Sequence, residues 1–138
     1  MALKNTVTSE PLLLIVPSYT ALLALIFIYL TFRVIKQRRK AKVAIGDGNN
    51  SALKRAIAVH NNFAQYVPLC LLLIAFLELN HAEAYIIHGL CITLLLGREI
   101  HAYGVSQESE NFKLRQAGMV MTFMVLIASS LFTFMQVI

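Results

Sequence analysis

Apolar runs without charged residues, long enough to cross a bilayer, recur along the chain. Residues 11–32 and 116–138 carry no charge over 22 and 23 positions, and shorter uncharged runs cover 67–77 and 84–97. A spanning helix needs about 20 mostly apolar residues, and membrane β-strands instead show alternating segments of about ten. The pattern predicts an all-α, polytopic membrane protein. We expect a four-transmembrane-helix bundle forming a single domain over 1–138, with helices at about 11–35, 51–79, 83–104 and 112–138.

Composition supports this class. The chain is 58% hydrophobic and 14% charged, with a mean hydropathy of +0.68, whereas soluble domains contain about 25% charged residues. The first apolar run leads directly into Arg33, without the short apolar core and small-residue cleavage site of a signal peptide. We therefore expect the first helix to be retained in the mature protein.

The distribution of positive charge predicts the orientation in the membrane. Eight of the twelve Lys and Arg residues lie between positions 33 and 55, and the connection near 80–83 has none. The third connection is bracketed by Arg98, Lys113 and Arg115. The positive-inside rule places the first and third connections in the cytoplasm and both termini outside. Beside a spanning helix, a basic run is typical of contact with anionic lipids, so we expect membrane lipids and no nucleic acid as partners.

The two cysteines give no sign of a metal or redox site. Cys70 and Cys91 lie within apolar runs and have no second Cys or His at metal-ligand spacing. Buried thiols in such places usually act as small hydrophobic side chains. We expect no bound metal and no catalytic cysteine.

A polar cluster precedes the apolar part of the second helix. At 100° per residue, four of its side chains fall within an arc of about 100°, and His60 points nearly the opposite way. Polar groups in hydrocarbon need partners, and this arc can offer a cation, two carboxamides and a phenol to one ligand. Alternatively, they hydrogen-bond neighbouring helices. The four residues of the arc are Arg55, Asn62, Gln65 and Tyr66.

Two more arginines are candidates on the same side of the membrane. Arg98 has His101 three residues later on the same helical face; the pair can serve a ligand, or Arg98 can extend to the interface and His101 can be a satisfied interfacial residue. Arg115 opens the fourth helix, where the dipole disfavours a cation, so it can hold an anion or stabilise a thiolate. Gly118 and Thr122 form a small-xxx-small pair that predicts close packing against a neighbour and fits oligomerisation.

Together these residues resemble the MAPEG family, the membrane-associated proteins in eicosanoid and glutathione metabolism, and within it the small bacterial branch. The resemblance extends from the end of the first helix to the fourth, and depends on the order and spacing of several motifs. They are Gly46-Asp47-Gly48, His60-x-Asn62-x-x-Gln65-Tyr66-x-Pro68-Leu69, Glu78-x-Asn80-x-Ala82, Gly97-Arg98-x-x-His101-x-Tyr103-Gly104 and Arg115-x-x-Gly118-Met119.

The resemblance implies a homotrimer, with glutathione as thiol cosubstrate bound between adjacent subunits near the cytoplasmic side. Arg115 is implied as the catalytic residue that stabilises the glutathione thiolate. Asn62, Gln65 and His101 match peptide-holding positions, and Arg38 matches an arginine at the end of the first helix. In a bacterium the implied location is the plasma (inner) membrane. With the residues of the helical faces, the expected glutathione-binding set is Arg38, Arg55, Asn62, Gln65, Tyr66, Arg98 and His101.

Two positions depart from the family pattern. Gln65 stands where glutathione-using members commonly have Glu, and Ala58 stands where they commonly have Arg. Charge-assisted contacts to the ligand are missing at both, although Arg55 can substitute in part. Two functions follow from this balance. One is a glutathione-dependent transferase or peroxidase acting on lipophilic electrophiles from the bilayer; the alternative is a non-catalytic membrane protein that binds a lipid or an anion.

Overall fold

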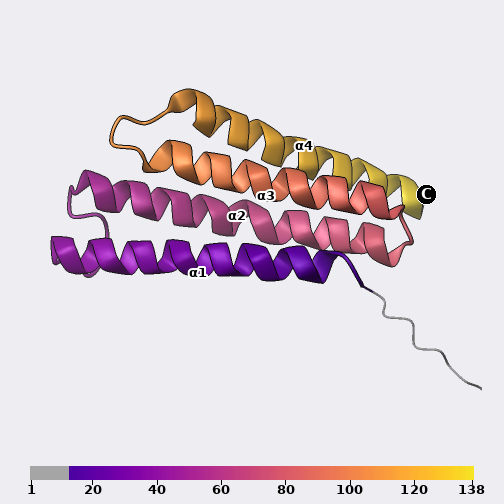
Figure 1. Cartoon of the computed structure of the whole chain (residues 1–138), viewed down its shortest axis with the longest axis horizontal. Coiled ribbons are helices and arrows are strands. Elements are labelled where there is room, and N and C mark those ends of the chain that lie inside the picture. The colour runs from indigo at the N-terminus through magenta and orange to yellow at the C-terminus, as the bar shows by residue number, and fades with distance from the viewer. Residues whose placement is uncertain (1–12) are drawn as a thin grey trace, which may run out of the picture.

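The computed structural model describes residues 13–138, which form four helices and no strand. The helices are α1 (Val16–Ala41), α2 (Ser51–Leu79), α3 (Ala84–Ser106) and α4 (Phe112–Val137). They run alternately in opposite directions in an elongated bundle (Figure 1). The α1–α2 and α3–α4 connections lie at one end, called here the cleft end. The α2–α3 connection and the C-terminus lie at the other, called the cap end. The predicted all-α fold is confirmed.

Helix α1 begins and ends later than the sequence indicated. Part of the expected start lies outside the described residues, and residues 13–15 are not helical. Pro17 then stands in the first turn, where a missing backbone N–H breaks no helical hydrogen bond. At the other end, α1 continues through the basic run to Ala41 because Lys and Arg are good helix formers and are favoured near a helix C-terminus. Lys42, with φ 55°, ends the helix in the left-handed region.

The remaining helices lie close to their predicted bounds. For α2 the bounds are those expected, and Asn50 is the capping residue. The Asn50 side-chain oxygen accepts the Leu53 backbone N–H at 2.9 Å, satisfying one of the donors that a helix start leaves free. Asn111 caps α4 in the same way. Helix α3 runs on to Ser106.

At the cap end, a carboxylate from α2 closes the start of α1. The Glu78 oxygens accept the backbone N–H groups of Leu14, Ile15 and Val16 at 2.7, 2.5 and 2.8 Å. Ile15 occupies the N-cap position and has no side-chain group that can bond there. A carboxylate at this position satisfies free donors and interacts favourably with the helix dipole. One of the motif residues, Glu78, therefore has a structural role.

Helices α2 and α3 form the centre of the bundle. Each packs against the other three helices, whereas α1 and α4 make no contact with each other. The buried core is apolar, and all four helices contribute side chains that pack closely within it. Its fully buried members include Leu23, Ile74, Leu77, Leu94 and Val125.

Helices α3 and α4 approach each other through glycines. A Cβ atom added at Gly118 would lie 2.5 Å from the Gly97 carbonyl oxygen and 2.6 Å from the His101 backbone nitrogen. No side chain fits in this space. Thr122, one turn further along, is fully buried in the same contact. Gly118 and Thr122 of α4 thus pack against α3 of the same chain. The sequence predicted close packing here without indicating which helix is the neighbour.

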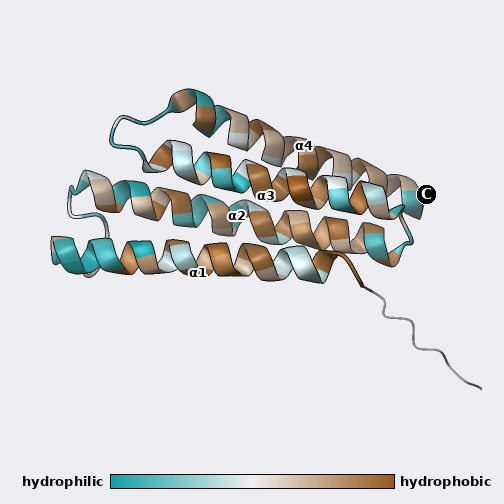
Figure 2. Ribbon diagram, in the orientation of Figure 1, coloured by the Kyte–Doolittle hydropathy of each residue, from teal (hydrophilic) through white to brown (hydrophobic). Residues whose placement is uncertain are grey.

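The exterior of the bundle suits a membrane. Helices α1, α2 and α4 are each long and apolar enough to cross one, and large apolar side chains such as Leu25 and Ile127 remain 63% and 60% exposed. Helix α3 has 23 residues and carries Arg98, Glu99 and His101 toward the cleft end. Polar colours gather at the ends in Figure 2, most densely where α1 ends. The chain is an integral membrane protein, since lipid is the solvent that matches this surface.

Candidate functional site

A polar cleft opens at the cleft end, between α2, the last turns of α3 and the start of α4. Its volume is about 450 Å³, within the range typical of small-molecule sites, about 300–1,000 Å³. The charges on its walls are Lys54, Arg55 and Arg115, with one carboxylate from Glu110. The cleft brings together five of the eight predicted site residues, namely Arg55, Asn62, Gln65, His101 and Arg115.

The α2 wall of the cleft is most of the predicted polar arc. Arg55, Asn62 and Gln65 all line it, with Ala58 between them. Arg55 and Asn62 are half-buried, and Gln65 is exposed. The 3.6-residue period of α2 places these groups on one face, and the contact of that face with α3 and α4 turns it into a wall. The helical period of 100° per residue therefore predicted correctly that these three side chains share one face.

Two other residues of the polar cluster point away from the cleft. The Tyr66 ring packs edge-on against Phe123 of α4, with 5.6 Å between ring centroids, and does not line the cleft. The His60 ring stacks on Phe27 of α1 at 4.6 Å, and its Nε2 lies 3.2 Å from the Thr31 hydroxyl. His60 thus faces α1, in the direction the wheel predicted. Tyr66 serves packing in this subunit.

Arg98 lies buried behind the cleft. It is 1% exposed, and its guanidinium donates to Asn62 Oδ1 at 2.6 Å and to Thr122 Oγ1 at 3.2 Å. This position excludes the alternative in which Arg98 extends to the membrane interface. A guanidinium can only donate, so the side-chain oxygen of Asn62 faces Arg98. The two side-chain N–H groups of Asn62 have no hydrogen-bond partner within residues 13–138. Asn62 is thereby oriented as a donor toward the cleft.

The charge of Arg98 has no counter-ion among the described residues, where the ion pair formed is Arg115–Glu110. Its Nε is buried without a hydrogen-bond partner in that part of the chain. Burying a charge is costly unless it is paired with an opposite charge or hydrogen-bonded. Here the acceptors are Asn62, Thr122 and the Met119 sulfur at 3.8 Å. An ionisable group at membrane depth commonly marks a functional site.

His101 and Arg115 are joined through the backbone. His101 is 3% exposed, and its Nδ1 lies 3.2 Å from the Arg115 carbonyl oxygen. A carbonyl oxygen only accepts, so Nδ1 carries the proton and donates, which leaves a lone pair on Nε2. This bond ties the last turns of α3 to the first turn of α4. It fixes the backbone from which the Arg115 side chain extends.

The Arg115 guanidinium is paired with Glu110 at the mouth of the cleft. Its Nη1 lies 2.7 Å from Glu110 Oε1, and the two side chains are 47% and 38% exposed. Exposed ion pairs contribute only about 0–1 kcal/mol. A ligand that offers either partner a better contact can therefore replace the pair at little cost.

Arg38 does not line the cleft of its own subunit. It donates to the carbonyl oxygens of Ala44 and Gly46 at 3.2 and 2.8 Å, which holds the α1–α2 connection. Gly46 has φ 76°, a conformation that favours glycine. The expectation that Arg38 contributes to a ligand site between subunits stays a prediction.

Comparison with known proteins decides the family. The MAPEG family profile matches residues 16–135. Two relatives, both called "Inner membrane protein YecN", come from Escherichia coli K12 and from Escherichia coli O6:H1. Each is 38% identical over 109 residues, which covers 79% of this chain and 82% of the relative. This chain belongs to the MAPEG family. No solved structure gives a significant match.

MAPEG membership confirms the resemblance and, at a coarse level, places the chain in a membrane family related to glutathione transferases. Two cleft residues that the sequence did not predict bear on the departures from the family pattern at positions 58 and 65. Glu110 supplies a carboxylate to the same cleft as Gln65, and Lys54 adds a cation beside Arg55. Lys54 was signalled by its place next to Arg55. Glu110 had no such signal, because only the fold of the α3–α4 turn brings it to Arg115.

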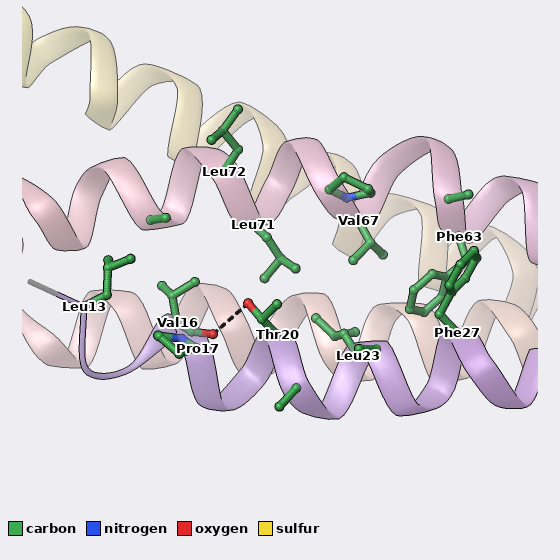
Figure 3. A pocket seen from close by; sticks show the side chains of 15 residues that line it. Leu13, Val16, Pro17, Thr20, Leu23, Phe27, Phe63, Val67, Leu71 and Leu72 are labelled. Carbon is green, nitrogen blue, oxygen red and sulfur yellow. Dashed lines mark hydrogen bonds between the residues drawn. The ribbon is translucent and has the colours of Figure 1, made fainter.

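The MAPEG chain also has a larger, apolar groove of about 810 Å³ between α1 and α2 (Figure 3). Phe27 of α1 and Phe63 of α2 stack at its end nearer the cleft, with ring centroids 5.7 Å apart. Thr20 is its polar side chain on α1, and that hydroxyl is bonded to the Val16 carbonyl at 2.9 Å. The groove therefore suits hydrocarbon and offers little to a polar ligand.

Proposed function

We propose that this protein is a membrane-embedded, glutathione-dependent transferase or peroxidase that acts on lipophilic electrophiles. The observation that carries the proposal is the single cleft that joins Arg115 of α4 to the polar arc of α2. MAPEG membership supports it. Glutathione has two carboxylates, one ammonium and one thiol, and the cleft offers three cations and one carboxylate. The three cations of the cleft match the two carboxylates and the thiolate of glutathione, and the one carboxylate matches its ammonium.

In this proposal each wall of the cleft holds one part of the tripeptide. Lys54 and Arg55 meet carboxylates, because cations on one helical turn can share an anionic group. Asn62, oriented by Arg98, donates an N–H to a peptide carbonyl. Glu110 accepts the ammonium that Gln65, being neutral, cannot bind as an ion pair. The charges missing at positions 58 and 65 are thus supplied from neighbouring positions.

Arg115 is the group placed to activate the thiol. A free thiol has a pKa of about 8.5, so lowering it by one or two units makes the thiolate abundant at neutral pH. The thiolate sulfur then attacks the electrophilic carbon and forms the carbon–sulfur bond, while the bond from that carbon to its leaving group breaks. The leaving group departs with the electron pair, and the thiol proton goes to water. With a hydroperoxide, the thiolate sulfur takes the terminal oxygen, the oxygen–oxygen bond breaks, and the remaining alkoxide takes a proton from water and leaves as the alcohol. A second glutathione then attacks the oxidised sulfur, which releases water and gives the disulfide. The electrophile enters from the bilayer.

The test is a glutathione titration of the full chain in detergent, following thiolate ultraviolet absorbance and the thermal shift together. Wild type should give a saturable thiolate signal. Arg115→Ala should lower that signal by about tenfold or more. Lys113→Ala, which removes an exposed cation outside the cleft on the same turn of α4, should match wild type. The proposal fails if millimolar glutathione gives no saturable binding.

A second candidate function is non-catalytic binding of a lipid or an anion. The Arg115–Glu110 pair at 2.7 Å favours it, because the carboxylate offsets the charge that would stabilise a thiolate. This function predicts a saturable thermal shift with no thiolate absorbance, and lipid that co-purifies in a defined amount. The same titration therefore separates the two functions.

The assembly and orientation belong to the proposal as well. We propose a homotrimer in which Arg38 of one subunit approaches the cleft of the next, with the α1–α2 and α3–α4 connections in the cytoplasm and both termini outside. In a bacterium the membrane is the inner one, in line with the name of the relatives. Arg38→Ala should then weaken glutathione binding, and the mass of the detergent-solubilised protein should be that of three chains.

A further inference from the structure

A second polar cleft lies on the other side of α3, between α3 and α1. Its volume is about 440 Å³. Its base includes apolar Ile26 and Leu30, and its polar side chains include Arg33 and Glu99. None of its lining residues belongs to the cleft around Arg115. It is a separate site, and neither the family match nor the proposed function accounts for it.

The charges of this cleft stand at the edge of the apolar region. Arg33 is the first charged residue after the uncharged run 11–32, and Glu99 lies just beyond the uncharged run 84–97. Helices α1 and α3 run in the same direction, so both leave the apolar region at the cleft end (Figure 1). Tyr29 and Tyr103 line the same cleft and are 63% and 61% exposed. Tyrosine is enriched at this depth, where hydrocarbon meets headgroups.

Arg33 and Glu99 share the cleft without pairing with each other. Arg33 donates one N–H to Ser106 Oγ at 2.8 Å, and its guanidinium carbon lies 6.0 Å from the Tyr29 ring centroid. These contacts position the guanidinium and leave most of its five donors free. Glu99 is exposed and accepts no side-chain hydrogen bond within residues 13–138. The cleft therefore presents a positive and a negative group, both with spare capacity, above an apolar base.

We infer that the α1–α3 cleft binds the headgroup of a zwitterionic phospholipid that carries a primary ammonium, phosphatidylethanolamine. Arg33 holds the phosphate, since guanidinium suits phosphate oxygens. Glu99 accepts the ammonium N–H groups, and an acyl chain continues along Ile26 and Leu30 into the bilayer. An anionic headgroup would leave Glu99 unpartnered beside a second negative charge. A trimethylated ammonium has no N–H to donate to a carboxylate.

The lipid series tests this directly. The full chain in detergent is titrated with phosphatidylethanolamine, its mono- and dimethylated forms, phosphatidylcholine and phosphatidylglycerol, all with the same acyl chains. Native mass spectrometry counts the bound lipid. Occupancy should fall stepwise as N–H groups are lost, with phosphatidylethanolamine favoured about two- to fivefold over phosphatidylcholine. Equal occupancy by these two lipids, or equal occupancy by phosphatidylglycerol, overturns the inference.

Variants locate the effect in the cleft. Glu99→Gln should abolish the preference for the primary ammonium while lipid still binds, and Arg33→Gln should lower the binding of every phospholipid in the series. Glu108→Gln and Lys36→Gln, exposed and outside the cleft, are the matched controls. Because Arg33 also contacts Ser106, Glu99→Gln decides the matter if Arg33→Gln does not fold. A preference that survives Glu99→Gln contradicts the inference.

The competing occupant is a second copy of the chain. Replacing Tyr103, which is exposed at this cleft, by cysteine gives a thiol there, while Cys70 and Cys91 are buried. Efficient Tyr103→Cys cross-linking between copies in lipid bilayers would show that protein covers the cleft and would also overturn the inference. If phosphatidylethanolamine binds there, it should protect the Tyr103→Cys thiol from a water-soluble maleimide more than phosphatidylcholine does; equal protection by the two lipids would contradict the inference.

Discussion

The two ends of the bundle use their charged side chains in opposite ways. At the cap end, the Glu78 carboxylate accepts three backbone N–H groups and is occupied by the fold. At the cleft end, Arg98 is buried and its Nε has no hydrogen-bond partner among residues 13–138, and Arg55 and Arg115 line an open cleft. A charge saturated by backbone groups supports stability, whereas charges with spare donors are available to a ligand. The fold thus uses the charge at the cap end to hold α1, and the charges at the cleft end are the ones that the proposed function assigns to a ligand.

The largest effect is expected from removing the main acceptor of Arg98. Asn62→Ala leaves a buried guanidinium with fewer partners, so the free energy of unfolding should fall by about 3 kcal/mol. Denaturant unfolding in detergent measures it. The control is Asn61→Ala, the exposed neighbour on α2, which should change stability by less than about 0.5 kcal/mol. Equal losses in the two variants would mean that Arg98 does not depend on Asn62.

The close contact of α3 and α4 gives the next effect. Gly118→Ala forces a methyl group into the Gly97 carbonyl and the His101 backbone, so unfolding free energy should fall by about 2 kcal/mol. Glutathione binding should weaken too, because His101 and Arg115 shift. Gly89→Ala is the control: nothing lies within 4 Å of its added Cβ, and helix propensity favours alanine. A thermal scan that shows the same melting temperature for both would contradict the contact.

A smaller loss of stability is expected at the cap end, where Glu78 holds the start of α1. Glu78→Ala removes the acceptor for the start of α1 and should cost about 1 kcal/mol, because water can reach this end and satisfy part of the loss. The thermal shift produced by glutathione at the cleft end should stay unchanged. Glu83→Ala removes an exposed carboxylate at the start of α3 that makes no side-chain cap bond and should be neutral. If Glu78→Ala also weakened ligand binding, the two ends would not be independent.

The smallest change concerns the ion pair at the mouth of the cleft. Glu110→Gln frees Arg115, so the thiol pKa of bound glutathione should fall and the thiolate should form at lower pH. Affinity should drop about two- to fivefold, because the ligand ammonium loses its carboxylate. A pH series of thiolate absorbance with Glu108→Gln as control measures both. Unchanged affinity would show that Glu110 does not hold the ammonium.

Much of the architecture follows from the chain pattern alone. Four uncharged runs predicted four helices, and the bounds of α2 were correct because turn residues precede it and polar ones follow it. Helix α1 ends later than the pattern predicts, because its basic run continues the helix to Ala41 and Lys and Arg are good helix formers. On α2, periodicity alone separated the face of Arg55 and Asn62 from that of His60.

Hydrophobic length and helical period are local properties, so the membrane class, the number of helices and the residues that share each face follow from the amino-acid pattern. Which faces meet depends on how the helices pack together. The tertiary structure buried Arg98 against Asn62 and turned Tyr66 onto Phe123. It also carried Glu78 and Glu110 to partners that their spacing does not indicate. Helix packing sets the contacts of Arg98, Tyr66 and Glu78, which join residues far apart in the chain, whereas the turn between α3 and α4 sets the contact of Glu110.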